Sequence, residues 1–271
     1  HKLQGEITPR LLEIMHIPYT ILEDDDKKFA NTVEKAVKYC KENRQPYGLI
    51  APKGVMAAND KPNNMDRTYP MSREEAMEVI LNNMPGDTIY SATTGRATRE
   101  LFFLREKRSE TKAHDFLNVG SMGHASSVAL GIALEKPERK VVALDGDSAC
   151  MMHMGAMTMV SKLDVPNFMH VVLNNGSHES VGGQPSAGHK VDFTKIAEAC
   201  DYATVGHPVT TEVELMEALE VLRNCGKASF IDCRIHKGLS RKLPPVIFDH
   251  REVIDALIDN LNESRITMDK K

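Results

Sequence analysis

The sequence predicts a doubly wound α/β fold, in which a parallel sheet is covered by helices on both faces. Segments such as 140–144 and 168–173 are made almost entirely of apolar residues, without the alternation of a half-exposed strand. Such runs are typical of strands that are buried on both sides. They alternate along the chain with segments of helical periodicity, and this alternation is typical of parallel α/β sheets.

Two strand-and-helix units open the chain. Thr8 and Pro9 predict the start of a short helix, with Thr8 as the N-cap and Pro9 in the first turn. Strands are predicted at 19–22 and 47–51, and a helix with apolar residues at helical spacing is predicted over 26–42. Two such units are too few for an independent domain of this architecture.

The periodic pattern stops over residues 52–70, where Lys, Asn, Asp, Gly and Pro predominate, and we interpret this segment as a linker. Ser72 and Glu75 then form a capping-box pattern that begins a helix. Beyond it, strands are expected at 88–91, 116–119, 140–144, 168–173 and 228–235, and helices at 98–105, 125–134, 149–163, 193–200 and 212–223.

The composition is that of an ordinary globular protein. The chain has 271 residues, of which 41% are hydrophobic and 27% charged, and a net charge of −4. Because acidic and basic residues are interspersed, we expect no nucleic-acid partner. No apolar run is long enough to span a bilayer, so we expect no membrane partner either. The 5 cysteines are scattered, which predicts reduced thiols and a cytoplasmic location.

One candidate site follows the predicted strand 140–144. Ligands of parallel sheets bind where strands end and helices begin. Gly146 permits a tight turn, and the N–H groups after it suit phosphate oxygens. The carboxylate of Asp147 would repel a phosphate unless a cation lay between them, so we expect Mg²⁺ to bridge Asp147 to a diphosphate. An isolated Asp at such a position is more often an N-cap.

A second candidate site follows the predicted strand 168–173, where Asn174 and Asn175 are the next two residues. Amide oxygens are good ligands for hard cations. One strand–helix–strand crossover separates this pair from Asp147, so both sites should fall at the same edge of the sheet. Alone, an Asn-Gly pair is usually a turn. The two motifs at this spacing form the specific signal. A nicotinamide-binding domain is not favoured, because no G-x-G-x-x-G follows a predicted strand.

Together these motifs resemble the diphosphate and metal motif of thiamine-diphosphate enzymes. The resemblance implies thiamine diphosphate and Mg²⁺ as cofactors. It also implies that Asp147, Asn175 and the main-chain carbonyl of Ser177 bind the metal, and that Gly146 and Ser148 contact the cofactor. Ser148 stands where the family most often has Gly, but the contact comes mainly from the backbone N–H.

Two further segments fit the same superfamily. GSMG, beginning at Gly120, resembles the segment that holds the aminopyrimidine. There the carbonyl of Gly120 accepts from the 4′-amino group and Met122 holds the cofactor in its bent shape. TTGR, ending at Arg96, resembles a loop on the diphosphate side and implies cofactor contacts by Thr94, Gly95 and Arg96. Alone, Met122 would be one core Met among 15 and Arg96 a surface charge.

Four segments resemble the phosphonopyruvate decarboxylase family and the related sulfopyruvate decarboxylases. The resemblance covers about residues 1–235 and is carried by SATTG (91–95), GSMGHASS (120–127), LDGDSACMMHMGAM (144–157) and LNNGSHESVGGQPS (173–186). It implies the decarboxylation of 3-phosphonopyruvate, a small anionic 2-keto acid, to phosphonoacetaldehyde and CO₂ in phosphonate biosynthesis. Sulfopyruvate is the alternative substrate.

The stretch SHESVGGQP discriminates best among these segments. Gly182 and Gly183 after a polar run predict a mobile loop over a site. Structural roles are equally plausible for two histidines, His153 and His178. The candidates for contact with the substrate, and hence for catalytic roles, are His178, Glu179, Ser180 and Gln184.

The resemblance also implies a domain division. Residues 1–51 resemble the final part of a pyrimidine-binding domain, and 71–271 a diphosphate- and Mg²⁺-binding domain with a C-terminal helix. The Glu that activates the cofactor would then lie upstream of His1, and no Glu of this chain matches its motif. The favoured explanation is that the sequence is a fragment. A separate upstream subunit and removal by proteolysis are the alternatives.

In this superfamily the cofactor lies between domains of two chains, so the resemblance implies a homo-oligomer. A function of another class also stays open. The chain could be a cofactor-binding subunit that is inactive without a partner chain or an N-terminal domain.

Overall fold

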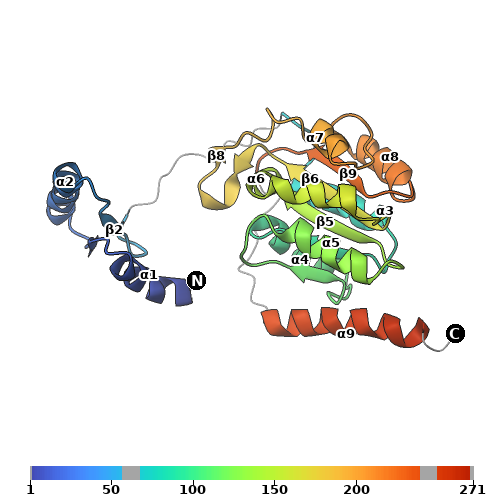
Figure 1. Cartoon of the computed structure of the whole chain (residues 1–271), viewed down its shortest axis with the longest axis horizontal. Helices are drawn as coiled ribbons and strands as arrows, with labels where there is room; N and C mark the ends of the chain where they lie inside the picture. The colour runs from blue at the N-terminus through green and yellow to red at the C-terminus, as the bar shows by residue number, and fades with distance from the viewer. Residues whose placement is uncertain (1, 57–67, 239–248, 269–271) are drawn as a thin grey trace. The chain divides into compact units, whose positions relative to one another are not determined.

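The computed structural model describes residues 2–56, 68–238 and 249–268 (Figure 1). The chain divides into two compact units, His1–Pro62 and Asn63–Lys271. This boundary falls within the predicted linker 52–70, although residues 57–67 of that linker lie outside the described part. The division into a pyrimidine-domain remnant and a diphosphate-binding domain stays a prediction.

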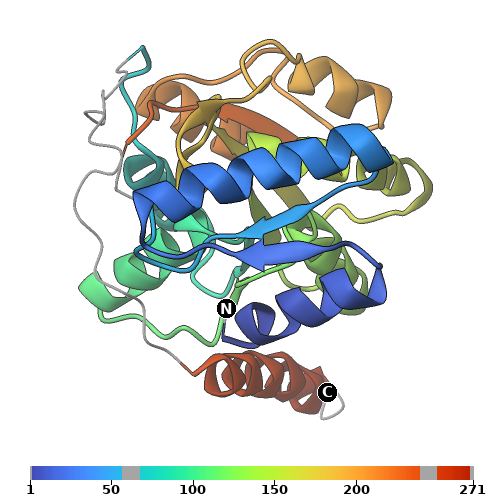
Figure 2. The ribbon, with the colours of Figure 1, turned by 90° about the vertical axis from the view of Figure 1, so that its left-hand side faces the viewer.

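The first unit contains two helices and two short strands. Strands β1 (Tyr19–Ile21) and β2 (Gly48–Ile50) pair in parallel, and helix α2 (Asp26–Asn43) connects them. Figure 2 shows α2 running alongside the two strands. Asp25 caps α2 by accepting from the backbone N–H groups of Lys27 and Lys28. These elements agree with the strands and the helix predicted for this region.

The predicted start of the first helix is wrong. Helix α1 spans Lys2–Ile14, so Pro9 lies inside it and not in its first turn. Proline has no N–H, and α1 therefore lacks the bond to the carbonyl of Gly5. Thr8 is not an N-cap, because its hydroxyl donates to the Gln4 carbonyl at 2.6 Å, one turn earlier in the same helix.

The second unit carries a five-stranded parallel sheet in the order β4-β3-β5-β6-β9, which confirms the predicted fold class. Its elements are α3 (Arg73–Asn83), β3 (Ile89–Ala92), α4 (Arg96–Lys107), β4 (Asp115–Leu117), α5 (Ala125–Glu135), β5 (Val141–Gly146), α6 (Asp147–Met152), η1 (Met154–Lys162), β6 (Phe168–Asn174), β7 (Ser177–His178), η2 (Glu179–Val181), β8 (Gln184–Pro185), α7 (Phe193–Ala199), α8 (Glu212–Leu222), β9 (Ser229–Arg234) and α9 (His250–Met268).

The helix predicted over 149–163 is two helices. Helix α6 ends at Met152, and the 3₁₀ helix η1 begins at Met154. Between them His153 has φ −130° and ψ 39°, outside the helical region. Its ring packs against the His124 ring, tilted by 54° and with the centroids 4.3 Å apart. The break therefore accompanies a contact with a distant loop, which apolar periodicity does not reveal.

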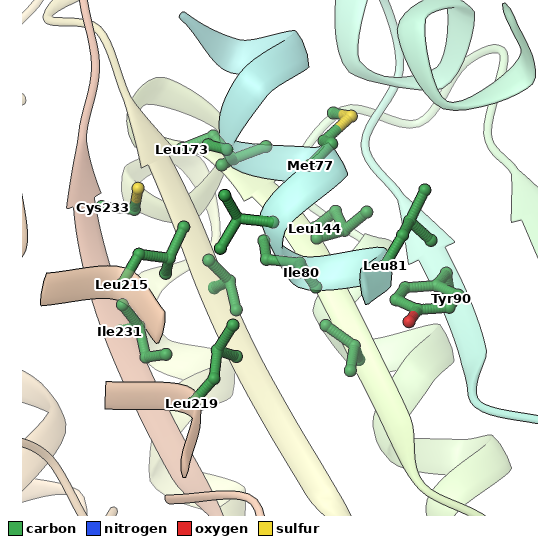
Figure 3. Packing of buried hydrophobic residues seen from close by; sticks show 14 of the residues in the cluster. Met77, Ile80, Leu81, Tyr90, Leu144, Leu173, Leu215, Leu219, Ile231 and Cys233 are labelled. Carbon is green, nitrogen blue, oxygen red and sulfur yellow. The ribbon is translucent and has the colours of Figure 1, made fainter. Parts of the chain in front are cut away.

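Helices cover both faces of the sheet. On one face, α3 and α8 pack on strand residues such as Leu144 and Leu173, as Figure 3 shows. On the other face, α5, η1 and α7 pack on the alternate residues of the same strands, such as Ala143 and Val172. Neighbouring residues of β5 and β6 thus point into two separate cores, which explains why both strands are mostly apolar.

The strand order reverses between β3 and β5. The chain passes from β3 outward to β4 and then returns to place β5 on the other side of β3. Helix α4, which follows β3, packs on one face, whereas α6, which follows β5, packs on the other. The loops after β3 and β5 therefore diverge, and such a switch point is where open α/β sheets bind ligands.

Strands β5 and β6 are neighbours in the sheet, with Gly146 paired to Leu173. The two predicted motifs consequently lie at the same edge, as expected from a single crossover. Within the described residues, no helix is both long and apolar enough to cross a membrane.

Ser72→Ala should weaken the start of α3. The Ser72 hydroxyl accepts from the N–H of Glu75 at 3.2 Å, and the Glu75 carboxylate accepts from the N–H of Ser72 at 2.7 Å. We expect the free energy of unfolding to fall by about 1 kcal/mol, measured by urea denaturation. Ser72→Gly should cost only a few tenths of that energy, because glycine also adopts the N-cap backbone. Equal losses for both variants would contradict the capping role.

Candidate functional site

The ends of β3, β5 and β6 surround a pocket of about 120 Å³. It lies at the switch point of the sheet. Most of the residues singled out from the sequence line it, namely Thr94, Arg96, Met122, Gly146, Asp147, Ser148, Asn175, Ser177, His178, Glu179 and Ser180. The sheet topology thus brings together segments that are far apart in the chain.

Four of the singled-out residues are not part of the pocket lining. Gly95 is the N-cap of α4, with φ 101°. Gly120 precedes the pocket residue Met122. Gln184 is exposed and pairs with His178 between β8 and β7. His153 packs against the His124 ring. Their predicted roles, like those of the pocket residues, remain predictions.

Asp147 is the first residue of α6 and its side chain is buried. One carboxylate oxygen, Oδ2, accepts from the hydroxyls of Ser148 and Ser186. The backbone of Gly188 packs directly against the same oxygen and against the Asn174 amide oxygen, so closely that a Cβ atom there would overlap both. Sequence reasoning missed Ser186 and Gly188, because their contacts join the end of β5 to a loop far along the chain.

The two asparagines after β6 have different roles. Asn174 is fully buried, and its amide nitrogen donates to Asp232 and to the Gly188 carbonyl, both at 3.0 Å. Asn175 lines the pocket instead. Its Nδ2 donates to Glu179 at 2.7 Å, and its Oδ1 accepts from the N–H of Ser177 at 3.1 Å. Only the second asparagine is therefore placed to contact a ligand.

A group of charged side chains closes one wall of the pocket. The carboxylate of Glu179 pairs with Arg73 at 2.7 Å and with Arg96 at 3.2 Å, and it accepts from the N–H of Gly238. Arg73 also pairs with Glu100 at 3.2 Å. Burial alone would raise the pKa of Glu179, but the charge of Arg73, its hydrogen bond and the Gly238 N–H outweigh burial and lower that pKa.

Arg73 is a pocket residue that the sequence did not indicate. Its only local signal is its place beside the capping box of α3. The partner that makes it part of the site, Glu179, lies 106 residues later in the chain. Such a pairing leaves no trace in local periodicity.

Thr93 Oγ1, a buried atom at the pocket, has no hydrogen-bond partner among the described residues, whereas the neighbouring Arg96 Nη1 is in the ion pair with Glu179. Buried polar atoms normally have a partner, and an acceptor oxygen of a bound ligand would provide one for the Thr93 hydroxyl. Beside the backbone of Gly146, the place that a Cβ would occupy is open space. The unpartnered Thr93 hydroxyl, the open space beside Gly146 and the carboxylate of Asp147 together fit an anionic group bound with a divalent cation.

No group of three or more His, Cys, Asp or Glu side chains able to hold a metal occurs among the described residues. A metal at this pocket would therefore combine one carboxylate with amide, carbonyl and ligand oxygens. That donor set suits Mg²⁺, which usually takes only one or two carboxylates together with phosphate oxygens.

The loop between β7 and β8 borders the pocket. Residues Glu179–Val181 form the 3₁₀ helix η2, and Gly182 and Gly183 follow with φ of 122° and 76°. Glycine adopts these angles without strain, so the two glycines allow the chain to turn back into β8. The predicted mobility of this loop stays a prediction.

Comparison with known proteins identifies relatives of this chain. Residues 93–233 match the family described as "Thiamine pyrophosphate enzyme, C-terminal TPP binding domain". A phosphonopyruvate decarboxylase of Streptomyces viridochromogenes is 34% identical over 81% of this chain and 57% of its own length. The beta subunit of a sulfopyruvate decarboxylase from Methanocaldococcus jannaschii is 27% identical over 68% of this chain and 95% of its own length.

A solved structure shares the fold. It is an enzyme from Mycobacterium smegmatis described as thiamin diphosphate-dependent, with a TM-score of 0.51 and 19% identity over 80% of this chain and 43% of that chain. The chain spans about half the length of the phosphonopyruvate decarboxylases that it matches, with 57% and 53% covered in two of them.

Gly188→Ala should destabilise the protein, because its Cβ would overlap the side chains of Asp147 and Asn174. We expect the free energy of unfolding to fall by about 1–3 kcal/mol, as for overpacked sites, measured by urea denaturation. Gly146→Ala is the matched control. Its φ of −106° suits any residue and its Cβ would meet no atom, so stability should be nearly unchanged. Equal stability of the two variants would disprove the close packing at Gly188.

Proposed function

This chain belongs to the thiamine pyrophosphate enzyme family, and on that premise we propose that it acts in the Mg²⁺-dependent decarboxylation of 3-phosphonopyruvate to phosphonoacetaldehyde and CO₂. Thiamine pyrophosphate is the same compound as thiamine diphosphate. The observation that carries the proposal is the pocket at the switch point, where Asp147 after β5 and Asn175 after β6 line one space. The identity of 34% to a phosphonopyruvate decarboxylase supports this choice of substrate.

We assign the metal to the carboxylate of Asp147, the amide oxygen of Asn175 and the carbonyl of Ser177. Asp147 and Asn175 are buried but line the pocket, as ligands of a partly enclosed ion must. The open space beside Gly146 leaves room for a diphosphate next to the backbone N–H groups of the turn. Ser148 lies on the same turn, and its hydroxyl also contacts Asp147.

The other predicted cofactor contacts complete this assignment. Thr94 and Arg96 line the pocket from the β3 side, and Gly95 shapes their turn. Met122 lines it from the loop after β4, which supports the proposed contact of Gly120 and Met122 with the aminopyrimidine.

When bound, thiamine diphosphate supplies an electron sink for the electron pair released as the 2-keto acid loses CO₂. The residues of this chain bind and orient the reactants. His178 and Ser180 line the pocket and carry groups that can hold or move a proton beside the keto carbon. The apolar side chains of Met122 and Leu173 line the same pocket and help to exclude water.

Sulfopyruvate is the alternative substrate, since it replaces the phosphonate by a sulfonate. One observation also favours a second function, that of a cofactor-binding subunit which acts only with a partner chain. The relative from Methanocaldococcus jannaschii is itself a beta subunit and is matched over 95% of its length. In either case we propose an oligomer with the cofactor between chains.

The test is to supply the chain with thiamine diphosphate, Mg²⁺ and each keto acid in turn, and to measure CO₂ and aldehyde. We expect turnover of 3-phosphonopyruvate when the chain is extended by the upstream segment that would carry the activating Glu. Turnover of sulfopyruvate alone would reassign the substrate. Cofactor binding in a calorimeter without turnover of either acid would favour the subunit function, and the absence of cofactor binding would refute the assignment.

Asp147→Ala should remove Mg²⁺-dependent binding of thiamine diphosphate. Removing a residue that only hydrogen-bonds to a metal ligand lowers metal affinity about 10- to 100-fold. Removing the ligand itself should therefore lower the affinity by more than about 100-fold. Calorimetry in the presence and absence of Mg²⁺ measures this change. Asp164→Ala, at an exposed position before β6, is the control. Unchanged cofactor affinity in Asp147→Ala would refute the metal assignment, provided that thermal unfolding shows both variants folded.

A further inference from the structure

The side-chain amide of Asn175 is held in one orientation from both ends. Its nitrogen faces the carboxylate of Glu179 at 2.7 Å, and its oxygen faces the N–H of Ser177 at 3.1 Å. An ionised carboxylate only accepts hydrogen bonds, and a backbone N–H only donates. The reversed amide would therefore place two acceptors against each other at one end and two donors at the other.

The carboxylate of Glu179 is itself firmly positioned. Its Oε2 accepts from Arg73 and Asn175, and its Oε1 accepts from the Gly238 N–H and forms an ion pair with Arg96. Its side chain is only 7% exposed. The partners of its two oxygens are all N–H donors, so the carboxylate acts only as an acceptor at this position. Both oxygens already have partners, which suits a positioning role better than direct contact with the substrate.

We propose that Glu179 is a positioning residue of the metal site, which orients the amide of Asn175 so that its oxygen and not its nitrogen is presented to the cation. This inference rests on the proposed metal site. An amide nitrogen carries two hydrogens and cannot bind a hard cation, whereas the amide oxygen can. A free asparagine amide can turn either way, so an orienting partner decides whether the ligand is available.

A double-mutant cycle tests this role. Glu179→Ala removes the orienting acceptor and should weaken Mg²⁺ binding about 10- to 100-fold. Asn175→Asp alone should also weaken binding, because it places a second carboxylate against Glu179. An aspartate presents an oxygen in either orientation and needs no orienting partner. In the Glu179→Ala background, Asn175→Asp should therefore strengthen Mg²⁺ binding, and the double variant restores the net charge of the wild type.

The measurement is the dissociation constant of Mg²⁺ at saturating thiamine diphosphate, by calorimetry on the full chain. The reversal of sign between the two backgrounds is the decisive result. A residue that only supports the fold would not produce it. If Asn175→Asp changes the constant equally in both backgrounds, or if Glu179→Ala leaves it unchanged, the positioning role is wrong.

Glu100→Ala is the matched control. Glu100 is also a buried carboxylate paired with Arg73, but it has no contact with Asn175. We expect a lower midpoint of thermal unfolding with an unchanged Mg²⁺ constant. Should Glu179→Ala fail to fold, Glu179→Leu fills more of the space, offers no acceptor to Asn175 and can replace it in the cycle, with the same reversal expected.

The cycle separates this inference from the proposed function. Loss of Mg²⁺ binding in Asp147→Ala together with normal binding in Glu179→Ala would leave the metal site standing and refute the role of Glu179. If the wild-type chain itself binds no Mg²⁺ with thiamine diphosphate, both proposals fall.

Discussion

The parallel pairing of β5 with β6 is the constraint on which the pocket depends. The register places Gly146 opposite Leu173, so the residues after both strands emerge at the same level of the sheet. A shift by one residue would turn the side chains of a strand from one core to the other. Because both faces of these strands are packed under helices, such a shift would disrupt two cores at once. The positions of Asp147 and Asn175 thus follow from the packing of β5 and β6 in the two cores.

The reversal of strand order then opens the space between these loops. Helices α4 and α6 leave neighbouring strands toward opposite faces, and a crevice remains between their first turns. The match to the TPP-binding domain begins at residue 93, directly after β3, and ends at residue 233, within β9. The region shared with the family therefore contains four of the five sheet strands, without the last residue of β9, together with the loops after β3, β4, β5 and β6.

Charge, more than apolar contact, holds the wall of the pocket formed by Glu179. This carboxylate joins the loop after β6 to Arg73 at the start of α3, Arg96 at the start of α4 and Gly238 after β9. A buried carboxylate is unfavourable alone, and the two arginines offset the loss of its hydration. The same group of charges fixes the Asn175 amide. Structural support and the orientation of a proposed ligand are therefore provided by one side chain.

The sequence by itself determined the fold class, nearly every strand and helix of the second unit, and the two motifs at the ends of β5 and β6. These features are local, because apolar runs, capping residues and a Gly-Asp turn act on their immediate neighbours. The first helix was misplaced, since α1 begins at Lys2 and continues through Pro9, and the Thr-Pro pair is typical of a helix start but does not exclude a helix interior.

Only the tertiary structure decided which residues share the pocket and what each contacts. Arg73, Ser186 and Gly188 join the site through partners distant in the chain, and no periodicity records such pairs. The distinction between Asn174, which supports the loop, and Asn175, which faces the pocket, likewise follows from their hydrogen-bond partners in three dimensions. Local patterns specify elements, whereas the contacts that build a site form only when those elements pack together.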